Sequence, residues 1–324
     1  MSDRRWIPGT FRVSAGLVFL LAPDLFGAQE PARMGAPAAS RTRVVMLGTG
    51  TPGPSPERSG PAIAIVVNGT AYLVDIGPGV VRRAAAAAAR HQLPALQPTA
   101  LRVVFVTHLH SDHTVGYPDL IFTPWVVGRR VPLEVFGPPG LRAMTDHVLA
   151  AWTDDIRIRN EGLESGFPEH SQSGYQVVVH EIAQPGVVYR DSNITVTAFA
   201  VKHGEWKYAY GYRFDTPDRS IVITGDTSPT DATVDACNGC DLLIHEVYTE
   251  KGYAAASQAW QNYRQKYHTS TRQLAELAGR ARPKLLVLYH QMYQFNASTE
   301  ADLLEEMRRF YKGRFSSSKD LDIY

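Results

Sequence analysis

A short apolar run that ends in a cluster of metal-binding side chains constrains this chain more than any other feature. Residues 101–106 read LRVVFV, which is typical of a buried strand. The next seven residues read THLHSDH and place three histidines and one aspartate within six positions. A turn after a rigid strand can converge alternate side chains on one point, and imidazoles with carboxylates suit Zn²⁺ and similar divalent ions. The spacing therefore predicts a metal site that contains His108, His110, Asp112 and His113.

Length and composition predict one folded domain of the α/β class. The chain has 324 residues, of which 44% are apolar, and this is enough for a sizeable core. Short apolar strands alternate with turns and a few helices, so we expect layered sheets over residues 42–324. The 33 basic and 32 acidic residues nearly cancel, which excludes a global field that would attract nucleic acid or an anionic membrane. No apolar run reaches the ~18 residues of a spanning helix, so we expect no membrane span.

The N-terminal segment has the layout of a secretory signal peptide. Three arginines precede an apolar stretch at residues 13–22, and Gly27 and Ala28 offer small side chains for cleavage. We therefore interpret residues 1–28 as a signal peptide and the Pro/Gly/Ala-rich residues 29–41 as a linker. This predicts a periplasmic or secreted protein. The alternative is an unprocessed leader, which would leave the protein in the cytoplasm.

The H-x-H-x-D-H pattern after an apolar strand resembles the signature of the metallo-β-lactamase superfamily. Further segments resemble its ribonuclease Z and arylsulfatase-like branch, in the family's order: LGTGTP at 47–52, DIG at 75–77, VKHG at 201–204, GYR at 211–213, TGDT at 224–227, HEVY at 245–248, HTS at 268–270 and LYH at 288–290. The resemblance implies a four-layer αββα sandwich, in which two mixed sheets are flanked by helices.

The resemblance also implies a centre with two Zn²⁺ ions, although Mn²⁺ or Fe²⁺ would suit the same ligands. Its ligands would form one group of three for each ion and one bridge: His108, His110 and His203; Asp112, His113 and His290; and Asp226. His203, Asp226 and His290 each follow a predicted strand, so all three can reach one edge of the layered sheets.

A dinuclear centre of this kind implies hydrolysis. Two Zn²⁺ ions with Asp112, Asp226 and a bridging hydroxide leave a net charge of about +1, and such a site lowers the pKa of bound water towards about 7. The resemblance implies that Glu246 and His268 transfer a proton to the leaving group, while Asp112 also holds the water. Glu246 has an alternative structural role, in which it hydrogen-bonds a neighbouring loop.

Three arguments lead us to predict an exported hydrolase of small phosphodiesters or aryl sulfate esters. Ribonuclease Z commonly carries a basic arm between the GYR and GDT segments, but here only residues 214–224 lie between them. The mature chain would be neutral, and the leader predicts export, so nucleic acid is disfavoured as a partner. The alternatives are a ribonuclease Z-like tRNA 3′-processing endonuclease, a lactone or carboxylic ester hydrolase, and a non-catalytic metal-binding protein. A homodimer is implied by analogy alone.

Two further segments lead to open or structural predictions. Cys237 and Cys240 form either a small disulfide loop or two ordinary thiols in a turn. Residues 151–190 have weak periodicity, so we interpret them as a loop or insertion that lines a pocket. Further candidates for the pocket wall are aromatic: Trp125, Tyr212 and Tyr293.

Overall fold

The computed structural model describes residues 42–293 and 298–324 of the chain. The predicted signal peptide, residues 1–28, and the predicted linker, residues 29–41, lie outside the described residues. The fold described below belongs to the compact unit Ser40–Tyr324. None of the helices within the described ranges combines the length and apolar character needed to cross a membrane.

The first sheet has six strands that lie side by side in the order of the chain. They are β1 (Thr42–Gly48), β2 (Ala62–Val67), β3 (Thr70–Val74), β4 (Val103–Phe105), β5 (Leu133–Gly137) and β6 (Val177–Glu181). The β1–β2 and β2–β3 pairs are antiparallel, and the pairs from β3 to β6 are parallel. Strand β4, which is buried throughout, lies within the predicted 101–106 strand, directly before the histidine cluster.

The second sheet has seven strands, again in chain order from one edge to the other. They are β7 (Gly186–Arg190), β8 (Thr195–Ala200), β9 (Tyr210–Asp215), β10 (Ser220–Ile223), β11 (Leu242–Tyr248), β12 (Leu285–Met292) and β13 (Phe315–Ser317). Strands β7 to β10 pair antiparallel, and β10 to β13 pair parallel. Both sheets are therefore mixed.

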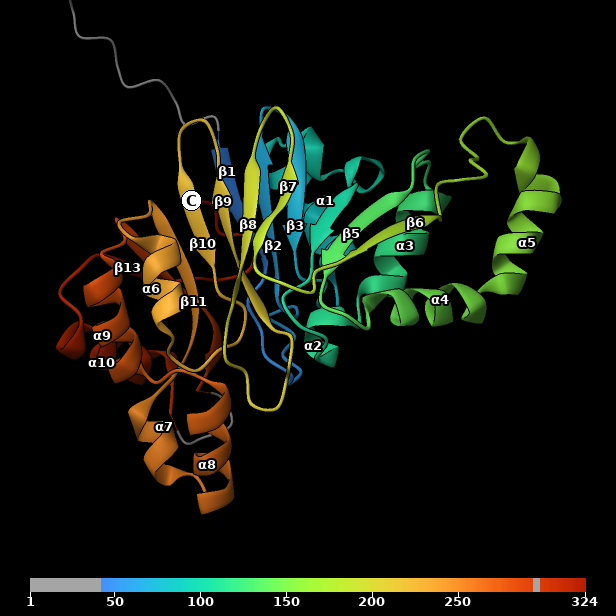
Figure 1. Ribbon diagram of the computed structural model, residues 1–324. Helices are drawn as coiled ribbons and strands as arrows, with labels where there is room; N and C mark the ends of the chain where they lie inside the picture. Colours follow the sequence, from blue (N-terminus) through green and yellow to red (C-terminus); the bar gives the residue numbers. More distant parts are fainter. Residues whose placement is uncertain (1–41, 294–297) are drawn as a thin grey trace, which may run out of the picture. The chain divides into compact units, whose positions relative to one another are not determined.

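Three separate apolar cores divide the molecule into four layers. Side chains such as Phe105 and Tyr212 fill the space between the two sheets. The outer face of the first sheet packs on α1 (Val80–His91) and α3 (Tyr117–Val126). The outer face of the second sheet packs on three helices, α6 (Asp231–Cys237), α9 (Thr271–Ala281) and α10 (Glu300–Phe310), as Figure 1 shows. The predicted αββα sandwich is confirmed.

Helix α9 begins where the sequence indicates. Ser270 accepts a hydrogen bond from the backbone N–H of Gln273, and Gln273 Oε1 accepts one from the Ser270 N–H at 3.0 Å. This reciprocal cap satisfies two backbone donors that the first turn leaves without helical partners. Leu274, Leu277 and Ala278 then lie buried against the second sheet, which fixes α9 behind the strands that carry the site.

The interpretation of residues 151–190 as a loop is wrong, although Trp152, Asp155 and Arg159 do line a small pocket beside α3. The region contains α5 (Thr153–Glu161) and the strands β6 and β7. Both strands lie at sheet edges and are largely exposed, so neither shows the continuous apolar run of a central strand. Figure 1 shows α4 (Leu141–Ala151) extending from the β5–β6 side of the first sheet, with α5 at its far end. The remaining helical elements are α2 (Ser111–Thr114), α7 (Glu250–Ala255), α8 (Gln258–Tyr267) and the short 3₁₀ turns η1 (Pro94–Leu96), η2 (Pro98–Ala100) and η3 (Leu163–Gly166).

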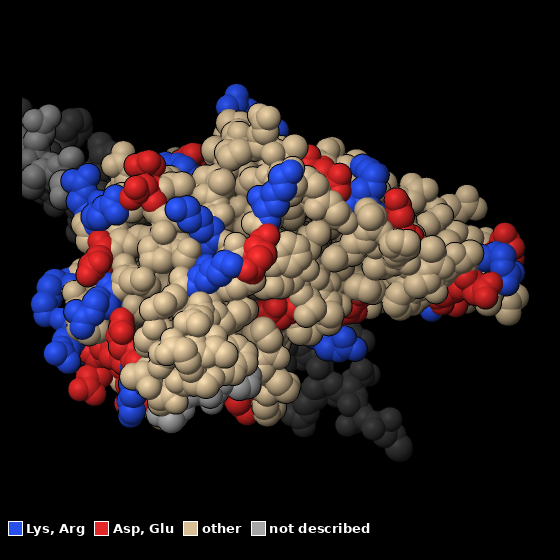
Figure 2. Space-filling model, turned by 60° about the horizontal axis from the view of Figure 1, so that its bottom comes forward, with Lys and Arg blue, Asp and Glu red and all other residues tan. Residues whose placement is uncertain are grey.

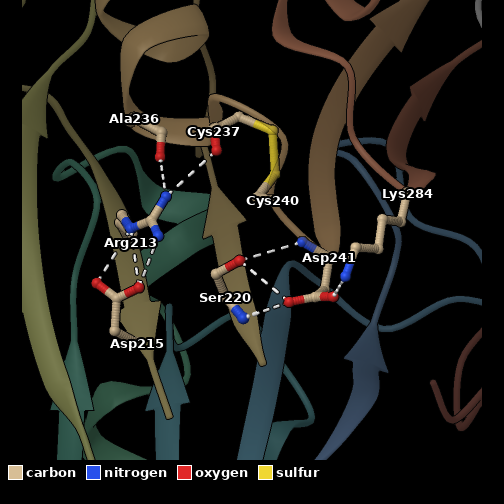
Figure 3. The surroundings of a disulfide bond; sticks show 8 residues. All are labelled: Arg213, Asp215, Ser220, Ala236, Cys237, Cys240, Asp241 and Lys284. Carbon is tan, nitrogen blue, oxygen red and sulfur yellow. Dashed lines mark hydrogen bonds and ion pairs between the residues drawn. A yellow bond between two sulfur atoms is a disulfide. The ribbon is translucent and has the colours of Figure 1, made fainter. Parts of the chain in front are cut away.

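Of the two alternatives for the cysteine pair, the structure has the disulfide. Cys237 at the end of α6 is bonded to Cys240, which precedes β11 (Figure 3). Arg213 on β9 donates hydrogen bonds to the carbonyl oxygens of Ala236 and Cys237 at 2.6 and 3.2 Å. The disulfide and this arginine together hold the end of α6 against the second sheet.

Candidate active site

The seven predicted metal ligands come from the ends of strands in both sheets. His108 and His110 follow β4, and the short helix α2 carries Asp112 and His113. From the second sheet, His203 follows β8 and Asp226 follows β10. Figure 1 shows α2 and the loop between β8 and β9 at the same end of the two sheets. The layered fold therefore brings together side chains that are far apart in sequence.

His108, His110 and His203 form one group of nitrogen atoms. His110 Nδ1 lies 3.1 Å from His108 Nε2 and 3.0 Å from His203 Nε2. All three atoms lie within 4.8 Å of one another. Three imidazoles that converge in this way are a ligand set suited to Zn²⁺.

Asp112, His113 and His290 form a second group beside the first. Asp112 Oδ2 lies 3.2 Å from His290 Nε2 and 3.5 Å from His113 Nε2. The Asp226 carboxylate is within reach of both groups. Its oxygens lie 3.4 Å from the Nε2 atoms of His113 and His290. Asp226 also forms a ligand group with His108 and His113. The Asp226 carboxylate could therefore contact a cation held by either group.

A bulge in β12 aims His290 at the cluster. Tyr289 pairs with Glu246 on β11, and Gln291 pairs with Val247, so His290 is the extra residue between them. His290 has φ 44°, in the left-handed region that is costly for a residue with a side chain. Bulges that re-aim a side chain in this way are frequent next to active sites.

Gly225 allows Asp226 to approach the end of β4. Its φ is 62°, and a Cβ at this position would lie 2.7 Å from Thr107 Cβ, which is closer than side-chain carbons pack. Glycine is therefore the residue that permits the turn between β10 and Asp226.

Unpartnered buried atoms show that the cluster fits a divalent cation. Five of the seven ligands are buried, with at most 3% of their surface exposed. His113 Nε2 and Asp226 Oδ1, which face each other, have no hydrogen-bond partner among the described residues. A buried polar atom without a partner costs about 1–3 kcal/mol, so such atoms accumulate where a ligand supplies the missing interaction.

Hydrogen bonds on the far side of the rings orient two of the imidazoles. His113 Nδ1 donates to Asp75 Oδ2 at 2.8 Å, and His203 Nδ1 donates to the Tyr267 carbonyl at 2.8 Å. Each bond leaves the Nε2 lone pair directed into the cluster, as metal binding requires.

Asp75 is a candidate site residue that the sequence analysis included only within the DIG segment at 75–77. It follows β3 with φ 61°, and its carboxylate also accepts hydrogen bonds from Thr107 N and Thr107 Oγ1 at 2.8 and 2.9 Å. One side chain thus joins the ends of the parallel strands β3 and β4 to His113. Its place at the end of a strand beside the histidine strand is the signal that identifies it.

Trp206 is a second residue that the sequence analysis missed. Its indole N–H donates to His110 Nε2 at 2.8 Å. A neutral His110 that accepts this bond carries its proton on Nδ1, the atom that faces His108 and His203. A cation at Nδ1 would move that proton to Nε2, so the Trp206 hydrogen bond would have to break.

The charges of the cluster compensate one another. Burial opposes the ionisation of Asp226, but the neighbouring His290 and His113 outweigh it and hold the pKa of Asp226 well below its usual range. Burial lowers the pKa of His203 to about 3, and it also lowers the pKa of His108. His203 and His108 are therefore neutral at pH 7, as metal ligands must be.

Glu246 and His268 lie together at the edge of the cluster. His268 Nδ1 lies 3.2 Å from Glu246 Oε1 and 4.0 Å from Asp226 Oδ2. Burial raises the pKa of Glu246 well above its usual range and lowers the pKa of His268 to about 3. Glu246 Oε1 also accepts hydrogen bonds from the backbone N–H groups of Thr227 and Thr269 at 3.2 Å, so the side chain fits a structural role as well as a proton-transfer role.

A cavity of about 750 Å³ opens onto the cluster. Five of the predicted site residues line it: His110, Asp112, Asp226, His268 and His290. Another part of its lining comes from α7, α8 and the residues between them, which the sequence analysis did not predict. The predicted aromatic walls are wrong, because Trp125, Tyr212 and Tyr293 are buried in the three apolar cores and do not line this cavity.

Two proteins named ribonuclease Z align with most of this chain. A ribonuclease Z of Mycobacterium sp. (strain KMS) is 35% identical over 265 residues, which is 80% of this chain and 87% of the relative. A ribonuclease Z of Mycobacterium bovis (strain BCG / Pasteur 1173P2) is 29% identical over 283 residues, which is 86% of this chain and 96% of the relative.

Solved structures share the fold. The metallo-β-lactamase fold protein YhfI from Bacillus subtilis matches with a TM-score of 0.64 and 17% identity, over 88% of this chain and all of that one. The short form of human tRNase Z matches with a TM-score of 0.59 and 24% identity, over 87% of this chain and 98% of that one.

These relatives overturn the predicted substrate. The prediction of a small phosphate or sulfate ester, with nucleic acid disfavoured, is wrong because the relatives are ribonucleases. Net charge averages over the whole surface, and Figure 2 shows Lys and Arg interspersed with Asp and Glu on one face. Residues 214–224 do fit into the β9–β10 hairpin, which leaves no room for an inserted arm there. Helices α4 and α5 extend from a different part of the fold, so a short β9–β10 connection does not exclude an RNA substrate. The export prediction stays a prediction.

A sequence model of a protein family also matches the chain. The model of the β-lactamase superfamily domain matches residues 70–291, which span both sheets from β3 to β12 and all seven predicted ligands. Together with the fold and the ribonuclease Z homologues, this match shows that the chain belongs to the β-lactamase superfamily.

Proposed function

We propose that the protein is a metal-dependent ribonuclease of the ribonuclease Z type, which hydrolyses a phosphodiester bond at the 3′ side of precursor tRNA. The observation that carries the proposal is the convergence of two His/Asp groups and Asp226 beside one cavity. The 35% identity to a ribonuclease Z over most of both chains supports an RNA substrate.

The ligand set supports two divalent cations, and its five imidazoles and two carboxylates favour zinc. His108, His110 and His203 would hold one ion, and Asp112, His113 and His290 the other, with Asp226 between them. When bound, such ions activate water at neutral pH and neutralise negative charge on a phosphoryl group.

The chain's own residues supply orientation and a proton. Asp112 lines the cavity, and its carboxylate can accept a hydrogen bond from the attacking water and so orient it. As the bond from phosphorus to the leaving oxygen breaks, that oxygen needs a proton. His268 lines the same cavity, and its Nδ1 lies 3.2 Å from Glu246 Oε1. Because burial raises the pKa of Glu246 and lowers the pKa of His268, the acidic proton of the pair lies on Glu246. We therefore assign the proton donation to a relay in which neutral His268 gives its Nε2 proton to the leaving oxygen and takes one from Glu246 at Nδ1.

The test is cleavage of a precursor tRNA with a 3′ trailer by the purified, metal-replete protein. We expect one cut at the trailer junction, and we expect His268→Ala to lower kcat by about 10²–10⁴-fold, the usual contribution of a general acid, while the metal content is retained. His290→Ala should lose metal as well as activity. His180→Ala, which changes an exposed histidine of β6, is the matched control. A wild-type protein that binds metal but leaves every precursor intact would refute the proposal.

A further inference from the structure

One face of α8 carries a row of aromatic rings. Trp260, Tyr263 and Tyr267 recur at the three- and four-residue spacing that places side chains on the same side of a helix. The Trp260 and Tyr263 rings lie 5.5 Å apart in an edge-to-face arrangement, and the Tyr263 and Tyr267 rings stack at 4.4 Å. The row is therefore a continuous aromatic surface.

The inner end of this row is fixed against the histidine cluster. The Tyr267 ring lies 5.0 Å from the His203 ring and packs onto Gly204, where a Cβ would lie 1.9 Å from the Tyr267 ring. The Tyr263 ring lies 5.6 Å from the His268 ring. These contacts hold the helix, and so the outer rings, in a set position relative to the proposed catalytic residues.

The outer end of the row is exposed and faces the cavity. Trp260 is 58% exposed and Tyr263 is 36% exposed, although both are large aromatic side chains. Both line the same cavity as Asp112, Asp226 and His290. Aromatic rings left open to water beside a catalytic cavity are the usual means of holding a flat ligand.

Helix α8 brings one basic side chain to the cavity. Its ten residues include Arg264 and Lys266 and no acidic residue, but Lys266 forms an ion pair with Glu205. Arg264 also lines the cavity, next in sequence to Tyr263. Aromatic faces together with basic side chains form the surface on which proteins hold single-stranded nucleic acid, since every base has a face that can stack.

We propose that Trp260 and Tyr263 form a stacking subsite for an unpaired nucleobase next to the phosphodiester that is cleaved. The inference rests on the proposed function for its substrate class. A base within a double helix has both faces covered by its neighbours, so the subsite selects single-stranded nucleotides. It places the adjacent phosphate towards Asp112 and His268, across the same cavity.

The test compares two chains that differ only in their bases. A single-stranded tetrauridylate and an abasic chain of the same length, both with phosphorothioate linkages to slow hydrolysis, are titrated into the metal-replete protein by calorimetry. We expect the tetrauridylate to bind at least about 10-fold more tightly, and Trp260→Ala and Tyr263→Ala to remove most of this preference. Trp260→Phe keeps an aromatic face and should keep most of the preference.

Trp152→Ala is the matched control, because Trp152 is 40% exposed and precedes α5, outside the cavity. Its preference for the base-bearing chain should equal that of the wild type. Equal binding of the two chains by the wild type, or an undiminished preference in both alanine variants, would overturn the subsite. A protein that shows the preference but cuts no precursor tRNA would instead refute the proposed function and leave the subsite standing.

Discussion

At the scale of single residues, the candidate site depends on side chains that do not face the cavity. Asp75 accepts hydrogen bonds from His113 and from the backbone N–H and hydroxyl of Thr107 while being almost fully buried. Its role is to fix which nitrogen of His113 carries the proton and where the ring points. Such a residue is a positioning residue, because it acts through His113.

Asp75→Ala should lower the affinity for the metal by about 10–100-fold, the usual effect of removing an outer partner of a histidine ligand. Competition with a chromogenic chelator measures this affinity directly. Asp235→Ala, which removes an exposed carboxylate on α6, is the control and should bind metal like the wild type. Equal metal affinity in Asp75→Ala and the wild type would show that the Asp75 contact is only structural.

Trp206 should report metal binding through its fluorescence. Its N–H donates to His110 Nε2, and this bond cannot persist when a cation occupies Nδ1 of the same ring. Removing the metal with a chelator should therefore shift the emission, and adding zinc should reverse the shift. The protein has five tryptophans, so the comparison requires Trp206→Phe, in which the chelator-dependent shift should be absent. A shift that survives in Trp206→Phe would contradict the assignment.

At the scale of elements, the parallel strands β10 and β11 are joined at their starts by Asp241. Its carboxylate accepts a hydrogen bond from Ser220 N at 2.8 Å and one from Lys284 Nζ at 2.7 Å (Figure 3). Burial would raise the pKa of Asp241, but these hydrogen bonds outweigh it and lower the pKa. Stabilisation from this group is thus fully present above the ordinary pKa of about 3.9 and is lost as the pH falls through the lower folded-state value.

Asp241→Asn should lower the free energy of unfolding by about 1 kcal/mol at pH 7. Urea unfolding at pH 7 and near pH 3 measures the effect, and the difference from the wild type should shrink at the lower pH. Asp231→Asn changes an exposed ion pair with Arg280 and should cost less. A difference that is the same at both values of pH would show that the charge of Asp241 is not responsible.

The elements also show which parts of the fold the sequence could predict. The apolar run of β4 is a local signal, and the structure has the strand as predicted, while the Ser270 cap of α9 is a signal of the same local kind. The edge strands β6 and β7 could not be recognised, because a strand with one neighbour and exposed side chains lacks a distinct apolar pattern. The cavity wall on α8 was missed because its aromatic residues are spaced like those of a core-facing helix.

At the scale of the whole molecule, motif order predicted the four layers and located the site, while global charge gave the wrong substrate. Motifs work because each ligand lies at or just beyond the end of a strand, and parallel neighbouring strands end at the same edge. Net charge fails to predict the substrate because it does not say where on the surface the charged side chains lie. The roles of Asp75 and Trp206 depend on contacts between segments 38 and 96 residues apart, which no local pattern contains.

The placement of His290 in the bulge of β12 has a consequence during synthesis. This histidine comes 180 residues after His110, near the end of the chain, and it completes the second group of ligands. A ribosome-bound chain that has emerged only as far as β11 therefore contains His108, His110 and His203 but lacks His290. For the proposed ribonuclease this means that cleavage requires β12 to have left the exit tunnel and joined its sheet.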